Sequence, residues 1–248
     1  MTNIAVLGCG PAGLLAAHAV AIAGYDPHIF SVKTPSRIGG AQYLHSAIHG
    51  LTDVEPDGKV EFVKIGSRDV YAEKIYGDIE APTSWEEFAH GIHEVWNLQE
   101  AYHNLWQMYH NNVIDVTVDY SMVLELNATH SLILSTIPPK GYCITPEHQF
   151  IRQRVWISQE LKCREMQIVY NGNPNLKWYR ASNLWGHTFT EYAFLPGHHP
   201  AVKVDKPLRT DCTCGKDLLV RLGRYGKWEK RPLSHDAYFG ALAAINAM

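Results

Sequence analysis

Three glycines near the N-terminus have a spacing that suits phosphate binding. Gly8, Gly10 and Gly13 form a G-x-G-x-x-G pattern. In such a loop the first glycine permits a tight turn, the second lets a phosphate approach the backbone, and the third allows a helix to pack closely on a strand. The free N–H groups at the start of that helix would then face the phosphates. These glycines are therefore the leading candidate for a ligand site.

The residues around the glycines make the pattern specific. The wholly apolar run Ile4–Leu7 predicts a strand buried on both faces. The Ala- and Leu-rich stretch Leu14–Ala23 predicts a helix that Gly24 ends, and His28–Phe30 predicts a second strand. Because the glycines lie between a strand and a helix, the pattern indicates dinucleotide binding. Ser31 ends the second strand and is placed to bond a ribose hydroxyl.

The motif resembles the flavoprotein branch of the dinucleotide-binding proteins, because it reads Gly-x-Gly-Pro-Ala-Gly-Leu. Arg37-Ile38-Gly39-Gly40 is similar to the Arg-x-Gly-Gly segment of the amine oxidase, phytoene desaturase and UDP-galactopyranose mutase group. That group usually has Glu where this chain has Ser31. A strand ending in Gly-Arg and a closing helix are also its usual C-terminal pattern. The resemblance implies FAD as the cofactor, with these contacts: Gly8, Gly10, Pro11, Ala12, Gly13, Ser31, Gly39, Gly40, Val116, Thr136, Gly223 and Arg224.

On spacing alone, two of these pairs have a plainer interpretation. Gly39 and Gly40 also fit a simple turn, and Gly223 and Arg224 also fit the end of a strand with a surface arginine.

The resemblance implies an α/β fold with a Rossmann-like FAD-binding domain, a parallel sheet with helices on both faces, and a small inserted α+β substrate region. We expect the FAD-binding domain over residues 1–50, 111–140 and 215–248, and the substrate or cap region over residues 51–110 and 141–214. The chain has 248 residues, of which 46% are hydrophobic and 19% charged, and this composition is typical of a globular protein with a substantial core.

The rest of the chain predicts further elements. Apolar runs predict strands over residues 59–65, 113–118, 132–138, 150–156, 166–170 and 219–226. Helices are expected over residues 67–76, over 85–110 with Ser84 as the cap, and from Ser234, as the cap, to Ala247. The segment Asn171–Pro174 predicts a turn between strands.

The candidate catalytic residues come from a resemblance of low specificity. Residues 177–192 resemble the stretch in mutase-like flavoproteins where an Arg and a Glu-aromatic pair approach the substrate cavity. This implies Arg180 and Glu191 as catalytic candidates, with Trp178 and Tyr179 lining the same cavity. Tyr43 is a third catalytic candidate, chosen by its position in the chain.

Histidine is the side chain most able to transfer protons near neutral pH. His45, His187 and His235 are possible acids or bases, although each also fits an ordinary core or surface histidine.

The cysteines favour no metal site and no disulfide framework. Five Cys is an odd number, and Cys212 and Cys214 are one residue apart, whereas zinc patterns usually have two to four residues between paired cysteines. We expect ordinary reduced thiols in a cytoplasmic protein without a membrane span.

The formal net charge of −3 excludes a strongly basic nucleic-acid-binding protein. A local basic cluster of Arg152, Arg154, Lys162 and Arg164 would be the candidate DNA contact, although a solvated strand face is the favoured interpretation of these charges.

The resemblance implies an FAD-dependent oxidoreductase that oxidises a carbon next to an amine and cleaves a C–N bond. Residues 39–45 and 222–228 are similar to small FAD proteins of bacteriophages, some of which are lyases acting on amino-acid-modified thymine in DNA. A small molecule or a modified nucleobase is therefore the expected substrate, and DNA a possible partner. The alternatives are a UDP-galactopyranose mutase-like flavin-dependent isomerase and an FAD-binding protein without redox turnover.

Overall fold

The structure is a computed structural model that describes residues 3–32, 43–81, 83, 85, 90–197 and 200–248. Gly39 and Gly40, and also Ser84, lie outside the described residues. The chain divides into two compact units. Unit 1 comprises Met1–Val54, Leu98–Arg152 and Pro207–Met248, and unit 2 comprises Glu55–Asn97 and Gln153–Lys206.

Unit 1 contains a parallel sheet in the order β13-β7-β1-β2-β6. Its strands are β1 (Ile4–Leu7), β2 (Pro27–Ser31), β6 (Val113–Asp115), β7 (Leu132–Ser135) and β13 (Val220–Arg221). Every residue of β1 is fully buried, as expected for the central strand of a sheet covered on both faces. The chain passes from β1 to β2 and β6 on one side and to β7 and β13 on the other. Such a change of direction is where open α/β sheets bind ligands.

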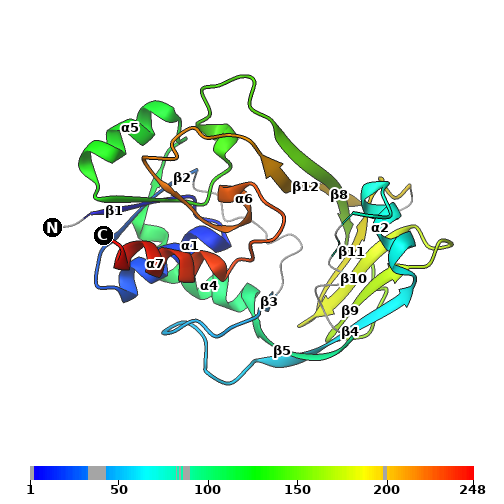
Figure 1. Cartoon of the computed structure of the whole chain (residues 1–248). Helices are drawn as coiled ribbons and strands as arrows, with labels where there is room; N and C mark the ends of the chain where they lie inside the picture. The colour runs from blue at the N-terminus through cyan, green and yellow to red at the C-terminus, as the bar shows by residue number, and fades with distance from the viewer. Residues whose placement is uncertain (1–2, 33–42, 82, 84, 86–89, 198–199) are drawn as a thin grey trace. The chain divides into compact units, whose positions relative to one another are not determined.

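Helices cover both faces of this sheet (Figure 1). On one face α1 (Pro11–Ile22) packs against α4 (Leu98–Tyr109) and α7 (Asp236–Asn246). On the other face α5 (Tyr120–Thr129) places Val123 and Leu126 in a core with Ala5 and Ile133 of the sheet. Unit 1 also contains β3 (Tyr43–Leu44), α6 (Gly223–Lys227), η1 (His110–Asn112) and η2 (Pro139–Gly141). The predicted α/β class with a doubly covered parallel sheet is confirmed.

Unit 2 is a mixed sheet with one described helix (Figure 1). Its strands follow the order β12-β8-β11-β10-β9-β4-β5. Their bounds are β4 (Gly58–Gly66), β5 (Gly91–Asn97), β8 (Phe150–Ser158), β9 (Gln167–Gly172), β10 (Trp178–Leu184), β11 (His187–Tyr192) and β12 (Ala201–Thr210). The turn predicted at Asn171–Pro174 begins two residues later than expected, because β9 continues to Gly172, and it leads into antiparallel β10.

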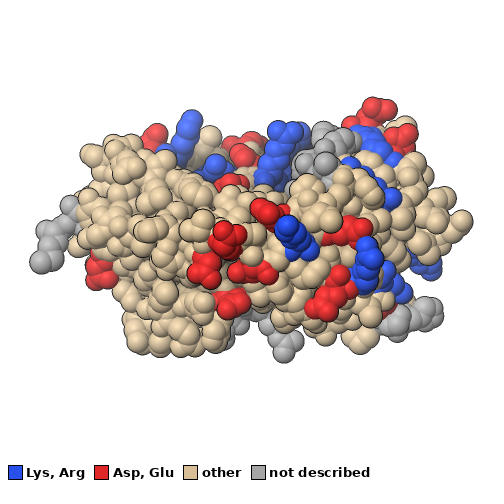
Figure 2. Space-filling model, turned by 90° about the horizontal axis from the view of Figure 1, so that it is seen from below, with Lys and Arg blue, Asp and Glu red and all other residues tan. Residues whose placement is uncertain are grey.

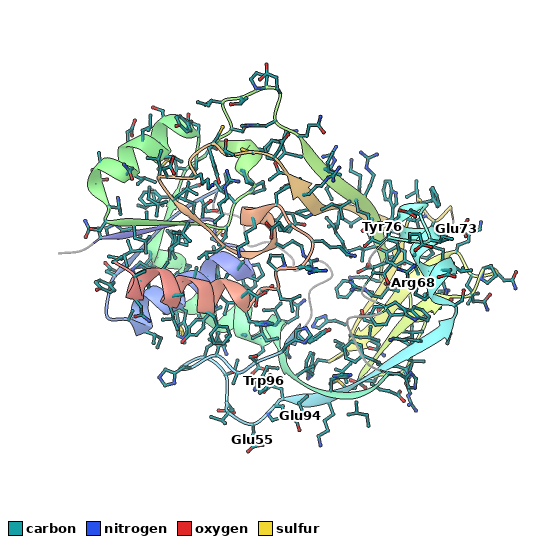
Figure 3. The ribbon with its side chains drawn as sticks, in the orientation of Figure 1. Glu55, Arg68, Glu73, Tyr76, Glu94 and Trp96 are labelled. Atoms are coloured by element: carbon teal, nitrogen blue, oxygen red, sulfur yellow. The ribbon has the colours of Figure 1, made fainter. Side chains whose placement is uncertain are left out.

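Local hydrogen bonds fix the ends of the unit 2 elements. The helix α2 (Arg68–Tyr76) begins at Ser67, whose hydroxyl accepts from the Val70 N–H, and ends at Gly77, as predicted. Arg68, labelled in Figure 3, is the first residue of α2, and its guanidinium donates to the Ala81 carbonyl at 2.9 Å. At the other end of the unit, the Trp96 indole donates to the Glu55 carbonyl at 3.1 Å.

The helix expected over residues 85–110 is wrong at residues 91–97. Residues 91–97 form β5, which pairs antiparallel with β4 from Gly58↔Val95 to Phe62↔Gly91. Leu98–Tyr109 is helical as predicted and forms α4. The apolar and aromatic residues fit either period, and pairing with a distant strand decides between them, which is a tertiary effect that overrides local propensity.

Two C-terminal expectations are also wrong. The strand expected over 219–226 is only β13, because Gly223 has a φ of +66° and starts α6. Ser234 does not cap α7 through its side chain. The helix begins one residue later, with His235 at the N-cap position, and the Asp236 carboxylate accepts from the Leu233 N–H at 2.7 Å.

The boundaries of the two units differ from the expected domains. Residues 98–110 were expected in the substrate region, but α4 belongs to unit 1 because its buried residues pack on α1. The Tyr102 hydroxyl also donates to the Cys9 carbonyl at 3.3 Å. Residues 141–152 and 207–214 likewise belong to unit 1.

Candidate functional site

The glycine loop, residues Gly8–Gly13, connects β1 to α1 in a backbone path that only glycine permits at two points. Gly8 has a φ of +104°, and a Cβ there would lie 2.7 Å from the Thr136 Oγ1. A Cβ on Gly13 would lie 1.9 Å from the Gly8 carbonyl oxygen. The first and third glycines therefore allow the tight turn and the close packing that the sequence predicts.

Gly10 differs from Gly8 and Gly13 because the space beside it is open. A Cβ on this residue would have no atom within 4 Å. Gly10 is the N-cap residue of α1 and makes no side-chain cap, and Pro11 occupies the first turn. The first intrahelical bond is donated by the Leu14 N–H to the Gly10 carbonyl at 2.9 Å. The N–H groups before Leu14 therefore have no partner inside α1 and can donate hydrogen bonds to an anionic ligand.

A cavity of about 350 Å³ in unit 1 adjoins this loop. Three predicted cofactor contacts, Gly10, Ser31 and Val116, lie on its wall. Its other lining residues, which sequence reasoning did not single out, are Cys9, Phe30, Val32, Thr117, Val118 and Ile137. The mostly apolar wall with a few polar groups is typical of small-molecule sites.

Ser31 and Val116 are held by the ends of their strands. The Val116 N–H donates to the Ser31 carbonyl at 3.1 Å, so the two residues extend the pairing of β2 with β6. The Ser31 hydroxyl donates to the Val32 carbonyl at 3.3 Å, which is a weak bond that a ribose hydroxyl could replace. The strand predicted over 113–118 ends at Asp115, and residues 116–118 instead line the cavity.

Thr136 bonds the end of β1 rather than lining the cavity. It is buried, and its hydroxyl donates to the Leu7 carbonyl at 2.8 Å while its own N–H donates to the same oxygen at 2.9 Å. Because its Oγ1 also lies against Gly8 and Gly13, it supports the glycine loop from beneath. It is not among the residues that line the cavity.

Gly223 lies where the first turns of three helices meet. A Cβ on Gly223 would lie 3.0 Å from the Ala12 Cβ of α1 and 3.8 Å from the Ala237 Cβ of α7. Gly223 itself begins α6, and Arg224 follows it as a half-buried residue. The predicted contacts Ala12 and Gly223 are thus brought together, 211 positions apart in the sequence.

Three aromatic side chains of unit 1 form a row that includes a predicted catalytic residue. The ring centroid of Tyr43 lies 4.6 Å from that of His45, and His45 lies 5.5 Å from His235. Burial lowers the pKa of His235, although the Asp236 carboxylate 3.6 Å from its Nε2 acts in the opposite direction. His235 is therefore neutral near pH 7 and can accept a proton.

The other two predicted catalytic residues belong to unit 2, in what we call the Glu191 cluster: Tyr179, Arg180, Glu191 and Lys206. Arg180 pairs with Glu191 across β10 and β11, and its guanidinium donates to Glu191 Oε1. The Lys206 ammonium and the Tyr179 hydroxyl donate to Glu191 Oε2 at 2.7 and 2.8 Å. No sequence pattern pointed to Lys206, because it is a single lysine within β12.

Glu191 is held as a carboxylate. Burial alone would raise its pKa, but the charges of Arg180 and Lys206 and the hydrogen bonds lower that pKa to about 2. Burial and the Glu191 charge raise the pKa of Tyr179 well above its usual value. Glu191 is therefore too weak a base to accept a proton near neutral pH, and it positions Arg180 and Lys206.

Three of the four basic residues considered for DNA binding have acidic neighbours. Arg154 lies 3.8 Å from Asp205, Lys162 lies 2.8 Å from Glu160, and Arg164 pairs with Glu61. Figure 2 shows acidic and basic side chains on the same face, among a larger area of uncharged residues. These pairs reduce the positive charge that a DNA backbone would meet.

Comparison with known proteins shows similarity in fold alone. No family model matches the chain, and no curated protein sequence matches it. Among solved structures, reduced UDP-galactopyranose mutase has a TM-score of 0.60 and 12% identity, over 99% of this chain and 93% of that chain. A flavoprotein/dehydrogenase from Cytophaga hutchinsonii has a TM-score of 0.55 and 13% identity, over 97% and 75%.

A third solved structure, 2-methyl-3-hydroxypyridine-5-carboxylic acid oxygenase, has a TM-score of 0.51 and 14% identity, over 98% of this chain and 81% of that one. The chain therefore has the fold of these proteins. In the part of the chain that the structure describes, no helix has both the length and the apolar character needed to cross a bilayer.

Proposed function

We propose that the protein is a flavoenzyme that binds FAD in unit 1, with the adenosine part in the cavity and the diphosphate against the glycine loop. The observation that carries this proposal is Gly10, which has open space beside it, begins α1 and lies on the cavity wall. The fold similarity to a flavoprotein/dehydrogenase and to a mutase supports the same assignment.

The residues present fit the cofactor. The cavity volume of about 350 Å³ is at the low end of the usual range for ligand sites, which suits a nucleoside portion. Val116 and its apolar neighbours offer a surface for an adenine ring, Ser31 a hydroxyl for the ribose, and the α1 amides donors for the diphosphate. When bound, FAD supplies hydride-accepting chemistry that the side chains of this protein cannot provide.

The reaction we favour is oxidation of a carbon next to an amine, followed by cleavage of the C–N bond. The fold similarity to a flavoprotein/dehydrogenase supports a redox reaction of this kind. Amino-acid-modified thymine in phage DNA is one candidate of this class, and other amino-acid-derived amines are equally compatible with the site.

The protein's own residues would bind substrate and move one proton. In unit 1, Tyr43 is the proposed substrate contact. In unit 2, Glu191 positions Arg180. Neutral His235 and its neighbour His45 are the proposed proton acceptors in unit 1. We propose a cytoplasmic, reduced environment for the protein.

A mutase-like isomerase is the second candidate, and the fold similarity to reduced UDP-galactopyranose mutase favours it. In that case the flavin would need to be reduced before turnover, and no net oxidation would occur. An FAD-binding protein without turnover would show neither property.

The visible spectrum of the purified protein tests the cofactor. We expect a flavin spectrum as purified or after addition of FAD, and loss of binding in Gly10→Phe, which fills the open space. Gly197→Phe is the matched control, since Gly197 in unit 2 also has open space beside it. A colourless wild-type protein that takes up no FAD would contradict the proposal.

A substrate screen separates the candidate reactions. Amines that bleach the flavin anaerobically and release hydrogen peroxide in air identify the oxidoreductase. Activity that requires prior reduction with dithionite identifies the isomerase instead. Binding of FAD with neither result identifies the protein without turnover.

A further inference from the structure

Four metal-binding side chains that sequence spacing did not connect converge in unit 1. They are Cys143, His148, Cys212 and Cys214, which we call the Cys/His cluster. Their ligand atoms, three Sγ atoms and one imidazole nitrogen, all lie within 4.8 Å of one another. Cys212 is buried and the other three residues are partly buried.

The separations match a tetrahedral zinc site. With Zn–S bonds of about 2.3 Å and Zn–N bonds of about 2.0–2.1 Å, neighbouring sulfurs lie about 3.8 Å apart and a sulfur and a nitrogen about 3.5 Å apart. In the structure the Sγ atoms of Cys143 and Cys214 are 3.7 Å apart. The His148 Nδ1 lies 3.3 Å from the Cys143 Sγ and 3.6 Å from the Cys214 Sγ. The four groups therefore already surround a space of the size that one zinc ion fills.

The two chain segments that carry the ligands are held together by hydrogen bonds outside the cluster. The Gln149 N–H donates to the Asp211 carboxylate at 2.7 Å, and the Thr210 hydroxyl donates to the Gln149 carbonyl at 2.7 Å. The Cys212 N–H then donates to the Thr210 hydroxyl at 3.1 Å. The ligand geometry is thus fixed by the surrounding backbone, as in a built metal site.

A cation next to the cluster suits the charge of a zinc–thiolate centre. Three thiolates, one neutral imidazole and Zn²⁺ carry a net charge of −1. The Arg221 guanidinium donates to the carbonyls of Cys212 and Cys214 at 2.8 and 2.7 Å, and one of its nitrogens lies 3.6 Å from the Cys212 Sγ. Such an outer-shell donor stabilises thiolate charge and orients the ligands.

We propose that Cys143, His148, Cys212 and Cys214 bind one structural Zn²⁺ in a closed Cys₃His site. On binding, each of the three thiols loses its proton to solvent, and His148 coordinates in its neutral form. Thiolate and imidazole ligands in a tetrahedral arrangement favour zinc over the hard cations Mg²⁺ and Ca²⁺. Since four protein ligands fill the coordination sphere, the metal has no open position and serves structure rather than catalysis.

The expectation of no metal site rests on the one-residue spacing of Cys212 and Cys214, which resembles none of the common zinc patterns. In the structure the partners of this pair, Cys143 and His148, come from a segment about 70 residues earlier in the chain. The zinc ion would hold in place the segment that leads into β13, and β13 in turn leads to Gly223 at the start of α6.

Metal analysis of the purified full-length protein tests the proposal. We expect about one zinc ion per chain after gel filtration. When a mercurial reagent modifies the thiols, the amount of zinc released should rise in proportion to the number of thiols modified. Protein made in zinc-supplemented medium that contains almost no metal would overturn the proposal. So would a disulfide within the cluster, whose sulfurs would lie about 2.05 Å apart, found by mass spectrometry in metal-free protein.

Variants test the ligand set. Cys212→Ser is expected to lose the zinc, whereas His148→Cys is expected to keep it, because Cys₄ is also a common zinc ligand set. Cys163→Ser is the matched control, since Cys163 belongs to unit 2 and should leave the zinc content unchanged. Equal zinc content in wild type and Cys212→Ser would overturn the assignment.

Cobalt substitution of the wild-type protein keeps the test valid if the variants do not fold. We expect Co²⁺ to give the intense visible bands of tetrahedral thiolate coordination, at longer wavelength than the absorption of oxidised flavin, and zinc to abolish them. Weak bands typical of octahedral Co²⁺ would overturn the proposal.

Discussion

The glycine loop of unit 1 and the Glu191 cluster of unit 2 use their polar groups in opposite ways. At the loop, the first amides of α1 have no partner inside the helix, and the space beside Gly10 is open. In the cluster, the oxygens of Glu191 accept from Arg180, Lys206 and Tyr179. A site with unused donors beside a cavity is ready for a ligand, whereas a cluster that satisfies its own groups mainly stabilises the fold around it.

The largest effect is expected when the carboxylate is removed from the cluster. Glu191→Ala leaves Arg180 and Lys206 without their buried anion, which should lower the free energy of unfolding by about 3–5 kcal/mol. Urea denaturation measures this. Glu94→Ala is the control, because Glu94 and Lys59 form an exposed pair at 3.9 Å whose loss costs below about 1 kcal/mol. Similar losses in both variants would remove the contrast between the cluster and an ordinary surface pair.

The same cluster predicts how stability depends on pH. The pKa of Glu191 is about 2 in the folded protein and about 4.3 in an unfolded chain, so its contribution to stability is fully present above pH 4.3 and is lost as pH falls toward 2. This contribution is about 3 kcal/mol in order of magnitude. Denaturation curves between pH 5.5 and about 2.5 should show the loss in wild type and a weaker one in Glu191→Gln. Parallel curves would contradict the assignment.

Gly13→Ala tests the packing of the glycine loop. The new Cβ would lie 1.9 Å from a backbone oxygen that cannot move independently, so we expect a loss of about 2 kcal/mol in unfolding free energy together with loss of FAD binding. Gly10→Ala is the matched control in the same loop, and its methyl group meets no atom within 4 Å. If Gly10→Ala is destabilised as much as Gly13→Ala, the two glycines do not have separate roles.

The smallest effect is expected at Ser31. A carboxylate here would accept a stronger hydrogen bond from a ribose hydroxyl, so Ser31→Glu should tighten FAD binding by about 1 kcal/mol, or about fivefold. Fluorescence titration with FAD measures the change, and Ser31→Gln supplies the uncharged control. Weaker binding in Ser31→Glu would place the ribose elsewhere.

The sequence predicts the β1–α1–β2 region well because the signal there is local. The apolar run Ile4–Leu7, the three glycines and the helix that follows are contiguous, and each residue type has a direct backbone consequence. Arg180 and Glu191, which are partners across β10 and β11, were predicted to lie together through a resemblance to known flavoproteins. Their roles in the reaction are a proposal.

What the sequence misses depends on distant partners. Residues 91–97 become a strand because β4 pairs with them, and nothing within those residues excludes a helix. The Cys/His cluster joins residues from 143 to 214, and Lys206 reaches Glu191 from another strand. In each case the deciding contact is tertiary, and single-sequence patterns report only neighbours along the chain.

The position of β1 in the middle of its sheet has a consequence for synthesis on the ribosome. β1 and β2 emerge first, but one edge of β1 is completed only by β7, more than 120 residues later, and β13 joins after that. Until then an apolar strand has an unpaired edge, which is a hazard for aggregation. We therefore expect nascent chains that stop before residue 132 to require chaperone protection, and the parallel sheet to form late in translation.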